Sequence, residues 1–196
     1  MTWVVTLGRM GPVNGQARPP MSYPEYLAAE AKSEVKHEFL RGEVWAMAGG
    51  TPSHAGMQVN VSSSLTVALK GRPCRVFSSD LRVRISETDR STYTVVCGKL
   101  ETAPEDPNAV TNPIVIVEVL SESTEASDRG EKFQHYARLP SLQEYVLVSQ
   151  FGRRVDVFRR SEGETWVFVP FTRGSVEFKS LGVSISLDDV YADPTR

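Results

Sequence analysis

The chain has 196 residues, enough for one domain that buries roughly 70% of its unfolded surface without disulfides or metals. Apolar residues make up 40% and charged residues 23%, and the formal net charge of −2 excludes a basic field over the whole molecule, which weighs against a tight DNA binder. The two cysteines, Cys74 and Cys97, form neither a secreted disulfide framework nor a zinc motif, so we expect buried free thiols in a reducing compartment.

The amino-terminal residues have the composition of an extension. Glycine and proline are frequent in residues 8–20, so residues 1–20 are predicted to be a flexible extension and residues 21–196 a single domain. No apolar run approaches the roughly 20 residues that span a bilayer, so we expect no membrane partner and a cytoplasmic location.

The first elements of the domain have clear boundary signals. Ser22 precedes Glu25 by three residues with Pro24 between them, which predicts a helix through about Glu30. Residues 36–40 and 43–48 alternate around Arg41 and Gly42, which predicts a hairpin. A helix whose apolar stripe faces the core is then predicted before the stop at Gly71, from the spacing of Met57, Val61, Leu65 and Ala68.

The middle of the chain is predicted to be mostly strands. Short strands are expected near 74–78, 80–86 and 93–97, followed by an acidic, proline-containing loop at 101–113. Residues 114–120 are mostly β-branched and apolar, as in a strand buried on both faces, but Glu118 interrupts them. An unpaired buried carboxylate is costly, so Glu118 must face a cleft, a bound cation or a positive side chain.

The last third is predicted to contain a helix and three strands. The helix extends from Ser127 to Arg138 and ends before Pro140, and it carries Asp128 and Lys132, of which Lys132 is the nearest candidate to meet Glu118. Strands are expected at 144–149, 153–159 and 165–170. This order of elements predicts an α/β or α+β domain with a mixed central β-sheet flanked by helices.

Five segments occur in one order along the chain, at 21–27, 36–44, 79–83, 117–124 and 128–136. Together they resemble the Uma-type putative restriction endonuclease family, a branch of the PD-(D/E)XK nuclease superfamily, over about Met21 to Tyr191. The resemblance implies a restriction-endonuclease-like core with an N-terminal helix and hairpin, a helix at about 53–70 before the strands that carry the acids, and additional C-terminal strands.

The resemblance also implies a chemistry. In that superfamily an aspartate and a glutamate on adjacent strands hold Mg²⁺, and a lysine two residues beyond the glutamate polarises the attacking water. Position 120 is leucine here, so the family pattern implies that Lys132 is the lysine's counterpart, with Asp128 beside it. It implies Glu118, Lys132 and the pocket residue Glu43 as catalytic residues, and Glu118 also as a metal ligand. It further implies Mg²⁺ as cofactor, DNA as partner, and a homodimer.

The chain departs from that pattern at one informative place. Relatives carry a Tyr-Pro-Asp segment before the Val-Val-Cys-Gly run, whereas residues 91–98 here lack the proline and the aspartate. Asp80 and Asp89 are the candidates to replace the missing ligand. The expected function is therefore that of a Mg²⁺-dependent DNA endonuclease whose hydrolysis of phosphodiesters is weakened or lost. The alternative is a non-catalytic nucleic-acid-binding or protein-interaction module on the same fold.

Other residues are compatible with a functional and a structural interpretation. Arg82 and Arg84 share one strand face and are candidates to bind nucleic acid, as is His54 near the start of the long helix; a solvated sheet edge and a structural histidine are the alternatives. His37 and His135 have no ligand-like spacing with His54, so no zinc site is expected.

The acidic residues also have structural alternatives. Glu38 is a pocket candidate or a residue of a solvated hairpin face, and Tyr136 belongs to the site or to the core. Asp128 and Lys132 have the spacing of an ordinary surface pair. Glu118 and Lys132 are alternatively a buried pair that only fixes the sheet against its helix.

Overall fold

The computed structural model describes residues 19–47, 49–162 and 165–192. Helix α1 (Tyr23–Glu30) begins at the predicted capping box, in which the Ser22 N–H donates to Oε2 of Glu25 at 2.7 Å. Strands β1 (His37–Leu40) and β2 (Glu43–Ala46) form the predicted hairpin, and its turn residues Arg41 and Gly42 both have positive φ. The sequence therefore predicted this part of the fold correctly.

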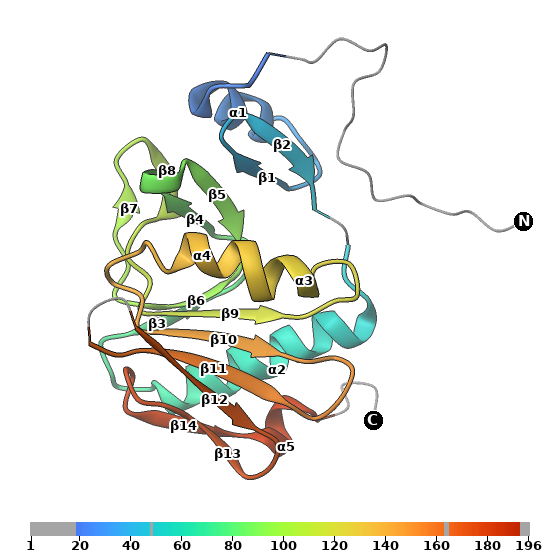
Figure 1. Ribbon diagram of the computed structural model, residues 1–196, viewed down its shortest axis with the longest axis vertical. Helices are drawn as coiled ribbons and strands as arrows, with labels where there is room; N and C mark the ends of the chain where they lie inside the picture. Colours follow the sequence, from blue (N-terminus) through green and yellow to red (C-terminus); the bar gives the residue numbers. More distant parts are fainter. Residues whose placement is uncertain (1–18, 48, 163–164, 193–196) are drawn as a thin grey trace, which may run out of the picture.

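The hairpin belongs to the first of two six-stranded sheets, in the order β2-β1-β5-β4-β8-β7 (Figure 1). Its other strands are β4 (Arg82–Ile85), β5 (Arg90–Tyr93), β7 (Thr102–Ala103) and β8 (Asp106–Val110), and the short 3-10 helix η1 (Ser86–Thr88) connects β4 to β5. The prediction of a loop at 101–113 was wrong, because β7 and β8 lie there. Both carboxylate oxygens of Asp106 accept hydrogen bonds from Arg82, at 2.7 and 2.8 Å, which holds an aspartate in a strand next to β4.

The second sheet has the order β12-β11-β10-β9-β6-β3 and contains the predicted buried strand. Its strands are β3 (Arg75–Phe77), β6 (Val95–Gly98), β9 (Val115–Val119), β10 (Glu144–Val148), β11 (Val155–Arg160) and β12 (Trp166–Phe171). Strands β9 and β10 are parallel, whereas β6 and β9 are antiparallel, so the sheet is mixed as expected. The structure divides the expected central sheet into two sheets, and at one of the places where the chain crosses between them, from β5 to β6, a single residue, Thr94, separates the strands.

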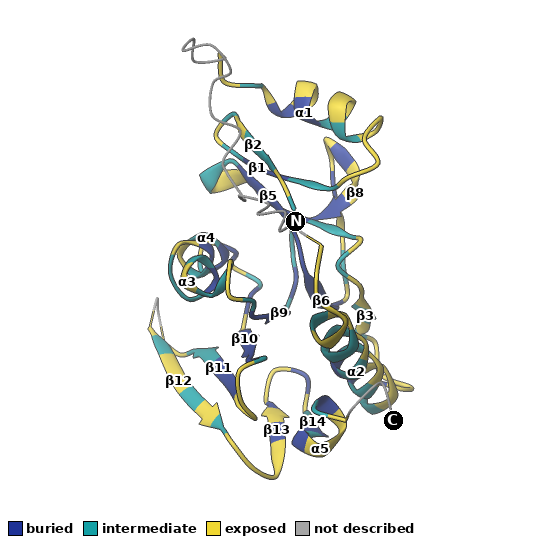
Figure 2. Ribbon diagram, turned by 90° about the vertical axis from the view of Figure 1, so that its right-hand side faces the viewer, coloured by how far each residue is buried: buried dark blue, intermediate teal, exposed yellow. Residues whose placement is uncertain are grey.

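Helical layers cover both faces of the second sheet (Figure 2). Helix α2 (Pro52–Ala68) packs Val61 and Leu65 against one face. The other face is covered by α3 (Glu125–Ser127), the π-helical turn η2 (Asp128–Lys132) and α4 (Phe133–Tyr136), where a single α-helix was predicted. The C-terminal β13 (Ser175–Phe178), β14 (Val183–Ser186) and α5 (Leu187–Val190) complete the core on the α2 side. The fold is the predicted mixed α+β class.

Three further expectations concern the ends, the thiols and membranes. The predicted flexible extension lies outside the described residues except for Pro19 and Pro20. Both cysteines are free; Cys97 is buried, and burial beside Cys74 raises its pKa to about 12, whereas Cys74 is only partly buried. Among the described helices, none has the length and apolar character needed to cross a bilayer.

Candidate functional site

Glu118 points to the helical layer formed by α3, η2 and α4. Alternate residues of β9 face opposite sides of the sheet, and Val115, Val117 and Val119 pack with the core that contains α2. Ile116 and Leu120 pack instead with the core that contains Tyr136. Glu118 has the same parity as Ile116 and Leu120, so its carboxylate enters the layer that carries Lys132.

Lys132 is the centre of a cluster of three carboxylates, which we call the carboxylate cluster. Its ammonium Nζ lies 3.0 Å from Oε1 of Glu38, 3.1 Å from Oδ1 of Asp128 and 3.5 Å from Oε1 of Glu118. All four side chains are at most 10% exposed. The predicted meeting of Glu118 and Lys132 is confirmed.

The π-helical turn places two members of the cluster. Asp128 and Lys132 are the first and last residues of η2, and both are buried beneath it. The surface-pair interpretation of these two residues was therefore wrong, since it took the spacing as that of an exposed helix face. Wide helical turns of this kind are frequent at functional sites.

Glu38 comes from the other sheet. Strand β1 pairs with β5 so that Phe39 faces Ser91, which places Glu38 next to Thr92. The Thr92 hydroxyl donates to Oε1 of Glu38 at 2.6 Å, and the Arg90 guanidinium donates to Oε2 at 3.1 Å. Because Glu38 is only 4% exposed, its interpretation as part of a solvated hairpin face was wrong. The polar residues of β5 were the sequence signal for this contact, because polar side chains in a buried strand need partners.

The tyrosines of the helical layer complete the hydrogen bonding. Tyr136 donates its hydroxyl to Oε1 of Glu118 at 2.8 Å, and Tyr145 donates to the backbone oxygen of Asp128 at 2.9 Å. Both rings are fully buried and lie 5.3 Å apart between centroids. Tyr136 is thus a core residue whose hydroxyl donates a hydrogen bond to Glu118.

Burial and charge set the protonation of the cluster. Burial, together with the charges of Asp128 and Glu38, raises the pKa of Glu118 to about 7, although Lys132 and Tyr136 oppose the rise. Burial alone would raise the pKa of Glu38, but Lys132 and Arg90 lower it below its ordinary value. The pKa of Lys132 is raised well above its ordinary value because the three carboxylates outweigh its burial. Lys132 stays charged, and Glu118 is the member that exchanges a proton near neutral pH.

A count of charges explains why the cluster takes up one proton. The carboxylates of Glu38, Glu118 and Asp128 bring three negative charges, and Lys132 and Arg90 bring two positive ones. One proton makes this buried group neutral. A carboxyl group with a pKa near 7 is suited to general acid or base chemistry.

The strand next to Glu118 carries a hydroxyl where the family pattern has an acid. Thr94 and Glu118 lie one residue beyond the Val95–Val117 pair, and the Thr94 hydroxyl donates to the backbone oxygen of Val117 at 2.8 Å. Mg²⁺ takes oxygen ligands at about 2.1 Å in near-octahedral geometry. Among the described residues, the two acids that share Lys132 with Glu118 are Glu38 and Asp128, and both already contact its ammonium.

These residues therefore do not fit a Mg²⁺ ion held as the family pattern implies. Over the described ranges, no group of three or more His, Cys, Asp or Glu side chains has an arrangement that could hold a metal ion. The centre to which a cation would be drawn contains the ammonium of Lys132.

The two candidate replacements for the missing aspartate lie elsewhere. The Asp80 side chain is 80% exposed and forms an ion pair with Lys36. Asp89 has positive φ in the turn before β5 and pairs with Arg84 at 2.7 Å. The proposed metal-ligand role of Asp80 is thus not supported by the geometry, because its charge serves a surface ion pair and it is not among the contacts of Glu118.

Glu43 is not brought into the carboxylate cluster. It faces Leu40 at the turn end of the β1–β2 hairpin and is exposed. Glu43 and Glu38 lie on the same face of the hairpin, but Glu38 pairs with Trp45 and lies deeper. The resemblance favoured Glu43, and the structure assigns the buried position to Glu38.

The two arginines predicted to contact nucleic acid instead contact other side chains of the protein. Arg82 makes its bidentate pair with Asp106 and also donates to the Tyr93 hydroxyl at 2.9 Å. Arg84 lies 3.7 Å above the centre of the Tyr23 ring and is buried. Strand β4 is an inner strand of its sheet, which explains why these charges are satisfied internally.

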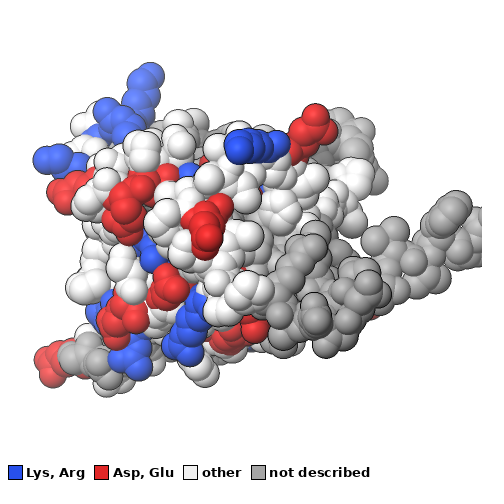
Figure 3. Space-filling model, turned by 90° about the horizontal axis from the view of Figure 1, so that it is seen from above, with Lys and Arg blue, Asp and Glu red and all other residues white. Residues whose placement is uncertain are grey.

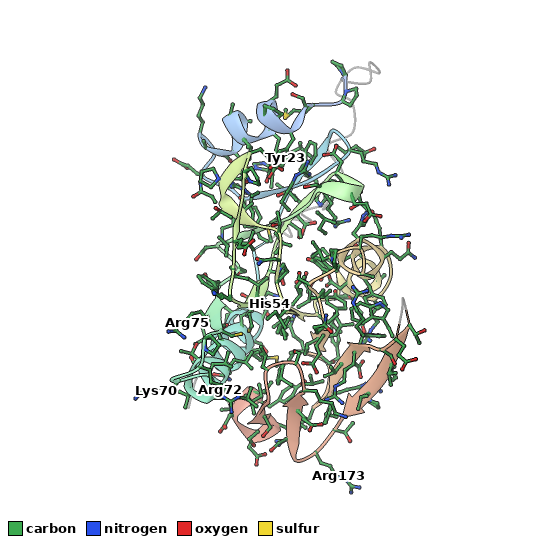
Figure 4. All side chains as sticks on the ribbon, turned by 90° about the vertical axis from the view of Figure 1, so that its left-hand side faces the viewer. Tyr23, His54, Lys70, Arg72, Arg75 and Arg173 are labelled. Atoms are coloured by element: carbon green, nitrogen blue, oxygen red, sulfur yellow. The ribbon has the colours of Figure 1, made fainter. Side chains whose placement is uncertain are left out.

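His54 lies at the start of α2, close to the end of β9 (Figure 4). Its Nε2 is 3.0 Å from the backbone oxygen of Val119, the residue after Glu118, and Thr51 caps the helix by accepting from the His54 N–H. His37 and His135 are elsewhere, beside Glu30 and Glu131. The ring of His54 thus contacts the backbone at the end of β9.

Comparisons with known proteins identify the family. The Uma2 family model, described as "Putative restriction endonuclease", matches residues 23–188. The chain is 36% identical over 177 residues to the uncharacterized protein slr1290 of Synechocystis sp., covering 88% of this chain and 92% of the relative. It is 32% identical over 158 residues to the uncharacterized protein sll1609 of the same organism, covering 79% and 89%.

A solved structure shares the fold. It is a crystal structure of a putative nuclease belonging to DUF820 from Anabaena variabilis, with a TM-score of 0.71 and 18% identity, covering 88% of this chain and 98% of that one. At this identity the likeness concerns the fold alone. With the family match over residues 23–188, the conclusion is that this chain belongs to the Uma2 family of putative restriction endonucleases.

Proposed function

We propose that this chain is a nuclease-like protein in which Mg²⁺-dependent hydrolysis of DNA phosphodiesters is weakened or lost. The observation that carries the proposal is the position of the Lys132 ammonium, 3.0 to 3.5 Å from all three buried carboxylates. In a metal-dependent nuclease at least one acid beside the glutamate must be available to the cation. Here Thr94 stands beside Glu118, and the other two acids are held by Lys132.

The protonation of Glu118 supports the same proposal. Burial raises its pKa to about 7, so at neutral pH a proton competes with any cation for the carboxylate. A divalent ion binding there would also have to overcome repulsion from the ammonium of Lys132 at 3.5 Å from Oε1. Both effects weaken metal binding in this chain.

Plasmid cleavage tests the proposal directly. The purified protein is incubated with supercoiled plasmid and Mg²⁺, Mn²⁺ or chelator, beside the variant Glu118→Gln. We expect the wild type to show little or no cleavage beyond that of Glu118→Gln under any of these conditions. Robust metal-dependent cleavage that Glu118→Gln abolishes would refute the loss of activity.

Two variants at position 94 test whether the missing acid is the cause of the weakened metal binding. Thr94→Asp adds the acid beside Glu118, and Thr94→Asn is its uncharged control of similar shape. We expect Mn²⁺ to raise the melting temperature of Thr94→Asp but not of Thr94→Asn, because an ion that binds only the folded state stabilises it. The response should disappear when Glu118→Gln is combined with Thr94→Asp. If Mn²⁺ raises the melting temperature of folded Thr94→Asp no more than that of Thr94→Asn, the residue at position 94 is not the reason for the weakened metal binding.

A further inference from the structure

Five exposed cations gather around the outer strand β3 of the second sheet, at the end away from Glu118. We call this surface the basic edge; it consists of Lys70, Arg72, Arg75, Lys99 and Lys179. They come from four different segments: the loop after α2, strand β3, the loop after β6, and the β13–β14 turn. Figure 4 shows Lys70, Arg72 and Arg75 together beside the end of α2.

Hydrogen bonds and strand pairing hold these segments next to one another. The Arg72 guanidinium donates to the backbone oxygen of Leu181 at 3.0 Å, which joins the loop after α2 to the turn that carries Lys179. Arg75 pairs with Gly98 in the sheet, which places Lys99 beside it. Arg75 also donates to the backbone oxygens of Arg72 and Cys74. The basic edge is therefore one continuous surface.

The charges of this surface are not neutralised within the part of the chain that the structure describes. None of the five cations has a carboxylate within ion-pair distance there, whereas Arg82, Arg90 and Arg159 all do. Arg72 and Arg75 use some of their five donors on backbone oxygens, which leaves the others for a ligand.

Stabilisation of α2 explains only part of this arrangement. Cations after the last turn of a helix interact favourably with its dipole, which accounts for Lys70 and Arg72. Lys99 and Lys179 belong to other elements and gain nothing from that dipole. Elsewhere charges are mixed: on the face seen in Figure 3, acidic and basic side chains are interspersed.

We infer that the basic edge binds the phosphate backbone of a nucleic acid, at a surface separate from the carboxylate cluster. Phe77 lies two residues after Arg75 on β3, on the same face of the strand, and is 37% exposed. An aromatic ring beside a row of cations suits a nucleic acid, whose bases stack while its phosphates are neutralised. A lipid surface or an acidic peptide fits this combination less well.

The position of the surface separates it from any hydrolysis at Glu118. His54 contacts the end of β9 from the first turn of α2, whereas Lys70 follows its last turn. The helix has 17 residues, which is roughly 25 Å at 1.5 Å per residue. Binding at the basic edge thus needs neither an intact carboxylate cluster nor a metal ion.

Fluorescence anisotropy with labelled duplex DNA, measured in chelator over a range of salt concentrations, tests the inference. Five phosphate contacts predict a slope of about −4.5 in a plot of log K against log salt. The double variant Lys70→Gln/Lys99→Gln should reduce the size of that slope by about two and weaken binding. Neither lysine side chain has a contact that folding requires among the described residues, so this variant should fold.

The control is the double variant Lys32→Gln/Arg173→Gln, which removes the same number of positive charges at other exposed positions. It should keep the wild-type salt slope. Polyglutamate and vesicles of phosphatidylcholine with phosphatidylserine serve as alternative polyanions. The inference is overturned if the wild type shows no salt-sensitive binding to duplex, if the control loses as much slope as the test variant, or if either alternative polyanion binds as tightly as DNA. These readouts contain no cleavage step, so they are independent of the proposed loss of hydrolysis.

Discussion

The ammonium of Lys132 lies 3.0 Å from Oε1 of Glu38, although the two residues are 94 positions apart and belong to different layers of the molecule. Glu38 is carried by the first sheet and Lys132 by the helical turn that covers the second. The sequence pointed to Glu118 as the partner of Lys132, at 3.5 Å, but the contact with Glu38 is shorter. Lys132 therefore joins the two sheets as well as neutralising Glu118.

Removal of the ammonium should destabilise the fold strongly. Lys132→Met leaves three buried carboxylates without their shared cation, and we expect a loss of about 3–5 kcal/mol in the free energy of unfolding. Lys32→Met, at an exposed lysine, is the control and should change it by less than about 0.5 kcal/mol. Urea denaturation at pH 8 measures both.

The double variant Glu118→Leu/Lys132→Met distinguishes a pair from a cluster. If Lys132 served Glu118 alone, replacing both by apolar residues would restore stability. Because Glu38 and Asp128 would still lack their cation, we expect the double variant to remain at least ~2 kcal/mol less stable than the wild type. Recovery of wild-type stability would contradict the cluster.

Stability should fall as the pH rises through the range in which Glu118 ionises. Its pKa is about 7 in the folded protein and near 4.5 in the unfolded chain, so between these values the folded state binds more protons. The contribution of Glu118 to the free energy of unfolding is therefore fully present below pH 4.5 and is lost by about pH 7. At ~1.4 kcal/mol per pH unit, this loss is about 3 kcal/mol.

Urea denaturation of the wild type and Glu118→Gln at several pH values between 5 and 8 checks this. As the pH rises, the free energy of unfolding of the wild type should fall relative to that of Glu118→Gln, since glutamine cannot ionise. The exposed residue Glu43 provides the control Glu43→Gln, which should follow the wild type. A constant difference between wild type and Glu118→Gln across this range contradicts the raised pKa.

The hydroxyl of Tyr136 should matter more at high pH than at low pH. Tyr136→Phe removes the donor to Oε1 of Glu118, and hydrogen bonds to a charged group contribute about 1.5–3 kcal/mol against about 0.5–1.5 kcal/mol for a neutral one. We expect the larger loss of unfolding free energy at pH 8 and the smaller at pH 5. Tyr191→Phe is the control, because its hydroxyl bonds only to backbone groups, and its loss should not depend on pH in this way.

Arg82 should act on stability rather than on nucleic-acid binding. Arg82→Gln leaves the buried carboxylate of Asp106 without its bidentate partner, and we expect a loss of about 3–5 kcal/mol. Arg173→Gln, at an exposed arginine, should be nearly neutral. Denaturation curves measure the loss, and the salt slope of DNA binding at a temperature where both variants are folded should equal that of the wild type. A reduced slope for Arg82→Gln would restore its predicted role as a phosphate contact.

The parts of the fold that the sequence predicted are those with local signals. The Ser22–Glu25 capping box marks α1, the Val61–Leu65 stripe marks α2, and the apolar run around Glu118 marks β9. Strand β8 was missed because Asp106 and Pro107 are rare in strands; a partner distant in sequence, Arg82, holds the segment there. Long-range pairing of this kind has no local pattern.

The candidate site was predicted only in part, because some of its residues have a local sequence signal and others do not. Glu118 and Lys132 were identified because a charge in a buried run must be compensated. The resemblance favoured Glu43, and the alternation in the hairpin could not correct it, because alternation does not say which end of one face becomes buried. The burial of Asp128 and Lys132 depends on the side of η2 that faces the sheet, which their spacing does not reveal.

A cut of the chain near Thr94 would divide the carboxylate cluster. Strands β5 and β6 are separated by that one residue, so the sheets have no linker between them at this point. Cutting the chain into an amino-terminal and a carboxy-terminal fragment near residue 94 would take Glu38, Thr92 and Arg90 into one piece and leave Lys132 with two acids in the other. One piece would hold Glu38 without Lys132 and the other Lys132 without Glu38, so a cut there removes the ion pair that joins the two sheets.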